Sequence, residues 1–299
     1  MRIGTRASRL ALAQANMVAA MIGGSEIVEI TTSGDHGAAA GDKSRWVAEI
    51  EDALSAGDID LAVHSAKDLP GELAPGLELL GAPARAAAED VLCGAGGLDQ
   101  LAPGARVGTS SIRRLAQLRA AREDLEIVEV RGNVDTRLRK LEDPGQSLDA
   151  IVLAHAGLQR LGLGDRAGGV LDPGRFVPAP GQGTLALQGR AGDERARQAA
   201  VAVTDPLAMA CLIAERACAA ELGASCHTPL GARARIAGEG RMSISAWVGL
   251  PDGSAWAADE LTAGAGDPAG LGRQSAARLR AAGAQGLLDQ AEEMAGVGR

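Results

Sequence analysis

The sequence predicts an α/β protein with two α/β domains and a small α+β domain at the C-terminal end. The chain has 299 residues, of which 46% are hydrophobic, and this is enough for more than one hydrophobic core. From the N-terminus to residue 190, short β-rich runs alternate with amphipathic runs of helical period, which is typical of mostly parallel sheets covered by helices. After residue 204, a helical run precedes short alternating strands and a closing helix.

The first two domains repeat a strand-then-helix pattern. In the first domain, strands are expected at 2–5, 25–32 and 58–63, and helices at 8–22 and 44–57. In the second domain, strands are expected at 89–95, 105–109 and 125–130, helices at 111–122 and 133–143, and a strand followed by a helix at 148–163. Residues 2–14 and 106–118 share the pattern R-[IV]-G-T, a serine that can cap a helix, and an arginine at the same position after this pattern. This similarity indicates an internal repeat.

The domain boundaries follow from Pro and Gly positions. The segment 178–183, "PAPGQG", predicts a crossing between domains, and the strand pattern 184–189 after it is expected to rejoin the first domain. The expected domains are 1–84 with 181–203, then 85–180, and finally 204–299.

The third domain opens with a well-marked helix. Thr204 or Asp205 serves as the cap, Pro206 lies in the first turn and Gly223 follows the end. Patterns at 232–238, 242–250 and 254–261 predict an antiparallel meander, and residues 266–294 predict one closing helix.

Composition excludes several classes of function. The formal net charge is −8, and the chain has three Trp, one Phe and no Tyr, so we expect no nucleic-acid binding. No apolar run has the length of a membrane helix, and Arg2, Arg6 and Arg9 interrupt any signal-peptide pattern; we therefore expect a cytoplasmic protein with no membrane contact. The four cysteines show no zinc-ligand spacing, which predicts reduced thiols and no metal site.

Arginines recur where the predicted strands end. Arg113 and Arg114 fall in the first turn of a helix, where the helix dipole disfavours cations. The arginines in this context and the polar residues beside them, which are candidate caps, are Arg6, Arg113, Arg114, Arg131 and Arg137 with Ser8, Ser110, Ser111 and Asn133. In an open α/β sheet such ends form one crevice, and we expect a bound carboxylate or phosphate there to compensate the arginines. A solvated surface position is the alternative for any one of them.

Two further residues each allow two interpretations. Asp68, beside Lys67 at a strand end, is either a general acid or charge stabiliser, or the partner of Ser65 in a capping box that Pro70 makes less favourable. Cys226 lies in a loop of small residues and is either a reactive thiol or an inert one. His64 is interpreted as a structural residue. Cys93, Cys211 and Cys218 lie in apolar patterns and are expected to be buried.

Seven segments in order resemble the porphobilinogen deaminase (hydroxymethylbilane synthase) family. They are "RIGTRASRLALAQ", "DIDLAVHSAKDLP", "VGTSSIRRLAQL", "EVRGNVDTRLRKL", "DAIVLAHAGLQRLGL", "PAPGQG" and "ERACAAELGASCHTPLG". The resemblance implies two domains similar to type II periplasmic binding proteins, with the active crevice between them, and a third domain that supplies a cysteine.

The resemblance also implies roles for individual residues. Cys226 matches the cysteine that holds a dipyrromethane cofactor through a thioether, and Asp68 matches the catalytic acid. The residues expected to bind the acetate and propionate groups of the pyrroles are Arg6, Ser8, Lys67, Ser110, Ser111, Arg113, Arg114, Arg131, Arg137 and Arg160. Those carboxylates would also explain the arginines in the first helical turn.

The reaction implied by the resemblance joins four porphobilinogen molecules head to tail, with loss of ammonia at each addition, and hydrolysis then releases hydroxymethylbilane. This is a transferase reaction of porphyrin, tetrapyrrole and heme biosynthesis, and we expect a cytoplasmic monomer. The competing interpretation is a non-catalytic bilobal binding module for a small carboxylate ligand, which would not need Cys226. A catalytically silent relative is the other alternative.

Two segments depart from the pattern of the family. Ala224 and Ser225 stand where the family usually has Gly-Gly before the cysteine, and a modest backbone adjustment is expected. Residues 33–45 form a shortened loop with Lys43, and Trp46 stands where Phe is usual; both residues are assigned to a possible lid.

Overall fold

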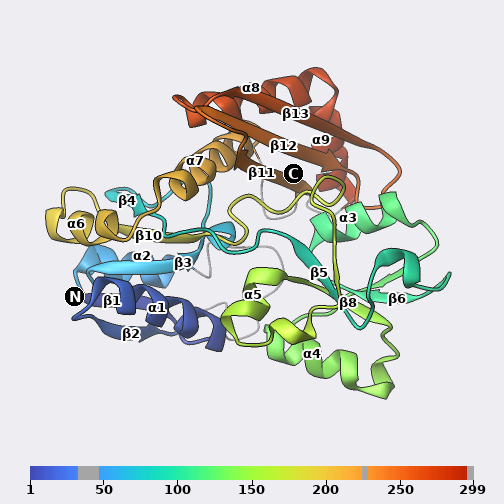
Figure 1. The fold of residues 1–299 in the computed structure, drawn as a ribbon, viewed down its shortest axis with the longest axis horizontal. Helices are drawn as coiled ribbons and strands as arrows, with labels where there is room; N and C mark the ends of the chain where they lie inside the picture. Colours follow the sequence, from blue (N-terminus) through green and yellow to red (C-terminus); the bar gives the residue numbers. More distant parts are fainter. Residues whose placement is uncertain (33–46, 224–227, 295–299) are drawn as a thin grey trace.

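The first lobe is built on a five-stranded sheet. The computed structural model describes residues 1–32, 47–223 and 228–294 (Figure 1). The strand order of the first lobe is β2-β1-β3-β10-β4. Its elements are β1 (Arg2–Arg6), α1 (Arg9–Ile22), β2 (Glu26–Ile30), α2 (Ala48–Ala56), β3 (Leu61–Ser65), the 3₁₀ turn η3 (Ala66–Asp68), β4 (Leu77–Gly81), β10 (Leu185–Arg190) and α6 (Glu194–Ala202). Strand β4 and helix α6 were not expected from the sequence.

The second lobe has the same topology, with the order β7-β6-β8-β5-β9. Its elements are β5 (Asp90–Cys93), η4 (Leu98–Gln100), β6 (Arg106–Gly108), α3 (Ile112–Ala121), β7 (Glu126–Val128), α4 (Val134–Glu142), η5 (Pro144–Gln146), β8 (Ala150–Ala154), α5 (His155–Arg160), η6 (Gly164–Arg166) and β9 (Gly169–Val170). Strands β1 and β6 occupy equivalent places, each followed by a helix with a serine N-cap, Ser8 or Ser111. The internal repeat is therefore confirmed.

Each sheet is mostly parallel, as expected, because four of its five strands run in the same direction and only β10 or β5 is antiparallel. In the first lobe, β1 pairs in parallel with β2 and β3, but β10 is antiparallel to both β3 and β4. The second lobe repeats this, with β5 antiparallel to β8 and β9. The reason is that β5 and β10 each enter their sheet from the other lobe, so they arrive in the opposite direction to strands joined by helical crossovers.

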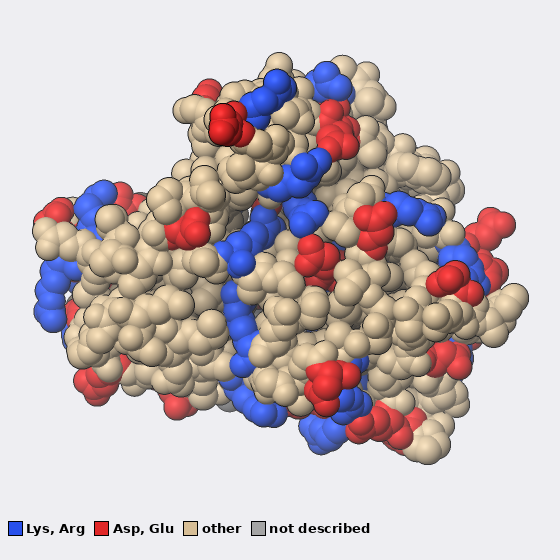
Figure 2. Space-filling model, viewed as in Figure 1, with Lys and Arg blue, Asp and Glu red and all other residues tan. Residues whose placement is uncertain are grey.

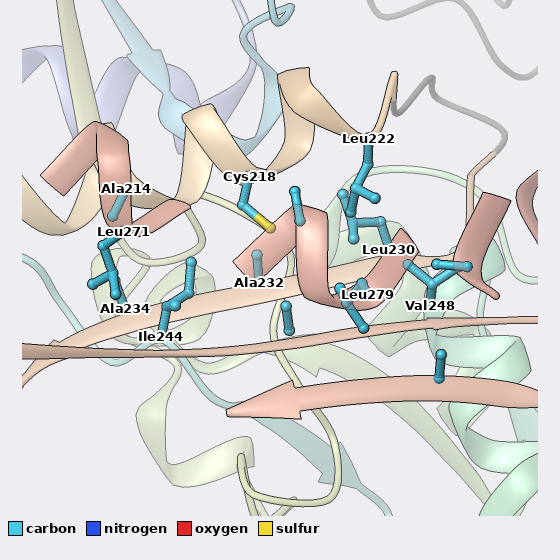
Figure 3. Close-up of a cluster of buried hydrophobic side chains, with 14 of the residues drawn as sticks. Ala214, Cys218, Leu222, Leu230, Ala232, Ala234, Ile244, Val248, Leu271 and Leu279 are labelled. Carbon is cyan, nitrogen blue, oxygen red and sulfur yellow. The ribbon is translucent and has the colours of Figure 1, made fainter. Parts of the chain in front are cut away.

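The third unit lies against both lobes and has its own core (Figures 1 and 3). It consists of α7 (Pro206–Glu221), β11 (Leu230–Ile236), β12 (Arg241–Gly249), β13 (Trp256–Gly264), α8 (Pro268–Ala281) and α9 (Ala284–Met294). Figure 3 shows Cys218 of α7 and Leu271 and Leu279 of α8 directed toward the sheet of β11–β13. The expected meander is confirmed, as is the α/β class with a small C-terminal α+β unit.

The start of α7 was predicted correctly from the sequence, but the break between α8 and α9 was missed. The Asp205 side chain accepts hydrogen bonds from the backbone N–H groups of Leu207 and Ala208, as expected for the cap of α7. The single closing helix is wrong, because the chain breaks between α8 and α9 at Gly283, whose φ of 93° lies in the left-handed region. No single helix in the described ranges is long and apolar enough to cross a membrane; α6 and α7 meet that test only as a pair bent by 110°.

Two segments connect the lobes, residues 82–89 and 171–184, and they run side by side. The Ala86 N–H donates to the Gly183 carbonyl at 3.1 Å. Gly183 has φ of +86°, and a Cβ atom there would lie 2.5 Å from the Ala86 carbonyl oxygen, so only glycine allows this approach. The domain boundaries expected from the sequence place the divisions in these segments, and they stay a proposal.

Glu215 of α7 joins both connecting segments to the third unit. Its carboxylate is fully buried and pairs with Arg85 of the first segment at 2.6 Å. It also accepts from the N–H groups of Gly181, in the second segment, at 2.6 Å and of Ala234, in β11, at 2.7 Å. One side chain therefore holds three parts of the chain that are distant in sequence.

We expect Glu215→Ala to lower the free energy of unfolding by about 3–5 kcal/mol, because it leaves the largely buried Arg85 cation, 14% exposed, without its carboxylate partner. Chemical denaturation with a tryptophan signal measures the change. The matched control on the same helix is Glu221→Ala, which removes an exposed ion pair with Arg280 and should change stability by about 0–1 kcal/mol. Equal effects of the two substitutions would contradict the assignment of Glu215 as the joint.

Candidate active site

A cavity of ≈ 260 Å³ lies between the two lobes, and we call it the crevice. Its walls come from the ends of β1 and β3 and the start of α1 in the first lobe, from α4 and α5 in the second, and from the connecting segment 181–184. Figure 2 shows Lys and Arg side chains gathered along the boundary between the lobes. Capture of an anion is the chemistry that this surface favours.

The crevice brings together seven of the residues predicted to be catalytic or to bind carboxylates: Arg6, Ser8, Lys67, Asp68, Arg114, Arg137 and Arg160. Four others are not among its lining residues: Ser110, Ser111, Arg113 and Arg131. Arg131 is half exposed and pairs with Glu129 at 2.6 Å. Ser110 is exposed, and Ser111 caps α3 by accepting a hydrogen bond from the Arg114 N–H at 3.5 Å. Lys43, Trp46 and Cys226 lie outside the described residues.

Local structure places Lys67 and Asp68 in the lining of the crevice. Strand β3 ends at Ser65, and η3 turns the chain at 66–68 before Pro70. The Ser65 side chain makes no capping hydrogen bond, so the capping box that the sequence allowed is absent; its hydroxyl bonds instead to Gln14 of α1 at 2.8 Å. The carboxylate of Asp68 is thus not used as a helix cap.

Asp68 lies among cations. Limited solvation in the crevice lowers the pKa of Lys67 to about 8, while the charge of Asp68 opposes the shift and that of Arg114 adds to it. Burial likewise lowers the pKa of Arg137 to about 10, with Arg114 adding to the shift and Asp68 opposing it. A single carboxylate therefore acts on the cations of both lobes.

Arg137 and Arg160 keep unsatisfied charge in the crevice. Arg137 donates from Nε to the Gly132 carbonyl at 2.7 Å, and Arg160 donates from Nη2 to the Gly183 carbonyl at 2.7 Å. Burial lowers the pKa of Arg160 to about 10, and its Nε is buried without a hydrogen-bond partner in the described part of the chain. Guanidinium groups with spare donors are suited to carboxylates, which accept in pairs.

Arg113 and Arg114 are compensated by a carboxylate of the chain itself. Both are buried, and Asp90, at the start of β5, pairs with Arg113 Nη2 at 2.8 Å and with Arg114 Nη2 at 2.7 Å. Burial by itself would raise the pKa of Asp90, but the two guanidinium groups and a hydrogen bond from Gln182 hold it below its ordinary value. The sequence interpretation, in which ligand carboxylates supply this compensation, is corrected accordingly.

Asp90 and Gln182 are the site-supporting residues that the sequence analysis missed. Asp90 is 1% exposed and begins the apolar strand "DVLC", and a charged residue in such a strand is a signal that it has buried partners. Gln182 lies in the motif "PAPGQG", which the sequence analysis used only to mark a crossing.

Comparison with known proteins matches both parts of the chain to one family. A family model described as "Porphobilinogen deaminase, dipyromethane cofactor binding domain" matches residues 1–198, and one described as "Porphobilinogen deaminase, C-terminal domain" matches residues 209–281. A curated porphobilinogen deaminase from Roseiflexus castenholzii is 47% identical, covering 96% of this chain and 97% of the relative. The curated porphobilinogen deaminase of Thermus thermophilus is 41% identical, covering 96% and 98%.

The solved structures matched by this chain include a periplasmic substrate-binding protein of an ABC transporter from Coxiella burnetii. It has 17% sequence identity and a TM-score of 0.42, covering 72% of this chain and 96% of that chain. A second is YhfZ from Shigella flexneri, with 20% identity and a TM-score of 0.37, covering 72% and 93%.

We expect Asp90→Asn to lower the free energy of unfolding by about 3–5 kcal/mol, because it leaves two buried guanidinium groups without a counter-charge. Equilibrium denaturation at neutral pH checks this. Glu129→Gln, which affects only the exposed pair with Arg131, is the control and should change stability by about 0–1 kcal/mol. Stability of Asp90→Asn within the range of the control would show that Asp90 is not the charge on which both arginines depend.

Proposed function

The chain belongs to the porphobilinogen deaminase family, and from this we propose that the crevice residues perform the family reaction in the roles described below. The protein is a transferase of tetrapyrrole biosynthesis, a hydroxymethylbilane synthase that joins four porphobilinogen molecules with loss of ammonia and uses a dipyrromethane cofactor. This assignment favours the enzyme over a non-catalytic carboxylate-binding module.

One observation carries the assignment of roles, namely the charge arrangement in the crevice. Among the described lining residues Asp68 is the only carboxylate, and the cations around it are Arg6, Lys67, Arg114, Arg137 and Arg160. Such a surface binds a ligand with several carboxylates and leaves one negative group for a developing positive charge.

The donor set suits a dipyrromethane that carries acetate and propionate groups. Arg160 has a buried Nε without a hydrogen-bond partner in the described part of the chain, Arg137 donates to the Gly132 carbonyl, and Lys67 lines the crevice with them. We propose that these side chains, with Arg6, Ser8 and Arg114, hold the carboxylates. When bound, the dipyrromethane supplies the growing end to which each substrate is added.

Arg113 has a supporting role in this proposal. It donates to Asp90 and to the Val177 carbonyl, at 2.8 and 2.9 Å, and it is not among the residues that line the crevice. We therefore propose that Arg114 contacts ligand carboxylates and that Arg113 holds Asp90 in place. Direct ligand contacts by Ser110, Ser111 and Arg131, and a lid formed with Lys43 and Trp46, stay predictions.

Asp68 is proposed as the catalytic acid. Loss of ammonia leaves the substrate as an electron-poor azafulvene, and a fixed carboxylate near the pyrrole N–H lowers the energy of its cationic form and can accept or return a proton. The charge of Asp68 acts on Lys67 and Arg137, so the carboxylate lies within the electrostatic reach of cations from both lobes. We further propose that the protein is cytoplasmic, and that it is a monomer because both walls of the crevice come from one chain.

The purified protein is expected to carry a dipyrromethane on Cys226. Its intact mass should exceed the sequence mass by two linked pyrrole units, and Cys226→Ser should have the sequence mass. Cys211→Ala is the control and should keep the added mass, because Cys211 is buried and burial raises the pKa of its thiol. A wild-type chain that stays unmodified after incubation with porphobilinogen would refute the attachment.

Asp68→Asn is expected to stay folded and to lose turnover by about 10²–10⁴-fold, the usual effect of losing acid and base catalysis. The amide keeps the size of the side chain but cannot supply the charge. Thermal midpoint and bilane formation should be compared for wild type, Asp68→Asn and Asp68→Glu, with the exposed Asp52→Asn as a control that keeps full activity. Near-normal turnover of Asp68→Asn would remove the catalytic role.

A further inference from the structure

His64 is a buried side chain of the crevice that the roles above do not use. It lies on β3, is 6% exposed and lines the same cavity as Asp68. Its place on a central strand gives the imidazole ring a rigid support. The sequence analysis interpreted His64 as structural, but its hydrogen bonds indicate a more specific role.

A chain of hydrogen bonds determines which nitrogen of His64 carries the hydrogen. Gln188 of β10 is fully buried and donates from Nε2 to Oε1 of Glu51 at 2.7 Å. Since a carboxylate offers only acceptors, Gln188 must present its amide oxygen to His64, whose Nε2 lies 2.9 Å away. The amide oxygen only accepts, so Nε2 carries the hydrogen and Nδ1 is an acceptor.

The surroundings keep His64 in this uncharged form. Burial lowers its pKa to about 4, and the hydrogen bond with Gln188 and the charge of Asp68 only partly oppose this shift. No residue in the described ranges donates a hydrogen bond to Nδ1. At neutral pH the crevice lining therefore includes an uncharged imidazole with an acceptor nitrogen, and the charge of the Asp68 carboxylate acts on this imidazole.

The substrate has one group that the cations of the crevice repel. The amino group that leaves as ammonia is an alkylamine, which is protonated at neutral pH. Its acetate and propionate groups fit guanidinium donors, whereas its ammonium needs acceptors. Among the described lining residues, Asp68 is the only carboxylate and His64 is the only imidazole.

We propose that Nδ1 of His64 accepts a hydrogen bond from the ammonium group of bound porphobilinogen and, with Asp68, orients this leaving group. The inference rests on the proposed function. In the deamination step, the C–N bond breaks and both bonding electrons leave with the nitrogen as neutral ammonia. The positive charge stays on the carbon skeleton of the pyrrole, where the Asp68 carboxylate stabilises it. His64 takes no proton; it determines where the departing nitrogen lies.

Two substitutions of His64 test the roles of its two ring nitrogens separately. Gln in place of His64 is long enough to donate to Gln188 but lacks the acceptor at Nδ1, whereas Asn places an amide oxygen near Nδ1 and is too short to reach Gln188. In the cofactor-loaded enzyme, we expect His64→Gln to keep its thermal midpoint and to lose about 10- to 100-fold in kcat/KM, the effect of one hydrogen bond to a charged group. His64→Asn should have the lower thermal midpoint of the two and the higher kcat/KM.

A binding comparison completes the test. The affinities are measured by calorimetry with Asp68→Asn alone and with Asp68→Asn combined with His64→Gln, since both turn over too slowly to consume the ligand; the ligands are porphobilinogen and an analogue with methyl in place of the aminomethyl group. The proposal expects His64→Gln to weaken binding of porphobilinogen alone; equal weakening of both ligands, or an active Gln variant beside an inactive Asn variant, would overturn it. Ammonia release by the wild type tests the proposed function separately, because the affinity ratio does not require turnover.

Discussion

The pairing of one buried carboxylate with two buried guanidinium groups is the interaction on which the crevice depends. Asp90 follows the first connecting segment, Arg113 and Arg114 begin α3, and Gln182 lies in the second connecting segment. A buried charge without its partner is destabilising by several kcal/mol, so this cluster keeps both connections and α3 in one arrangement. Arg114 can line the cavity because Asp90 balances its charge from within the protein.

Among the residues that the structure describes, two other cations of the crevice, Arg137 and Arg160, lack the buried carboxylate partner that Arg114 has. Arg137 and Arg160 are hydrogen-bonded to backbone carbonyls and have no carboxylate partner in the described part of the chain, and burial lowers the pKa of both. This arrangement is less stable without an anionic ligand than with one. Binding of a carboxylate ligand should therefore stabilise the fold, since a ligand that binds only the native state shifts the unfolding equilibrium.

The third unit is joined to the crevice by helix α7. Glu215 in the middle of this helix fixes Arg85 and Gly181, which belong to the two segments that connect the lobes. In sequence, Cys226 follows shortly after the end of α7. The chain that leads to Cys226, the proposed cofactor cysteine, thus starts from a helix that is held by the second connecting segment, which forms part of the crevice wall.

The sequence by itself determined the family and most local elements, though not β4, α6 or the break between α8 and α9. Helix caps, periodicity and motifs act over a few residues, and the caps at Ser8 and Asp205 are examples. The sequence did not reveal Asp90 or Glu215, whose arginine partners lie 23 and 130 residues away. Only the tertiary structure decided which arginines face the crevice. Arg113 and Arg114 are neighbours in one helical turn, but successive side chains point about 100° apart, so one lines the cavity and the other supports it from behind.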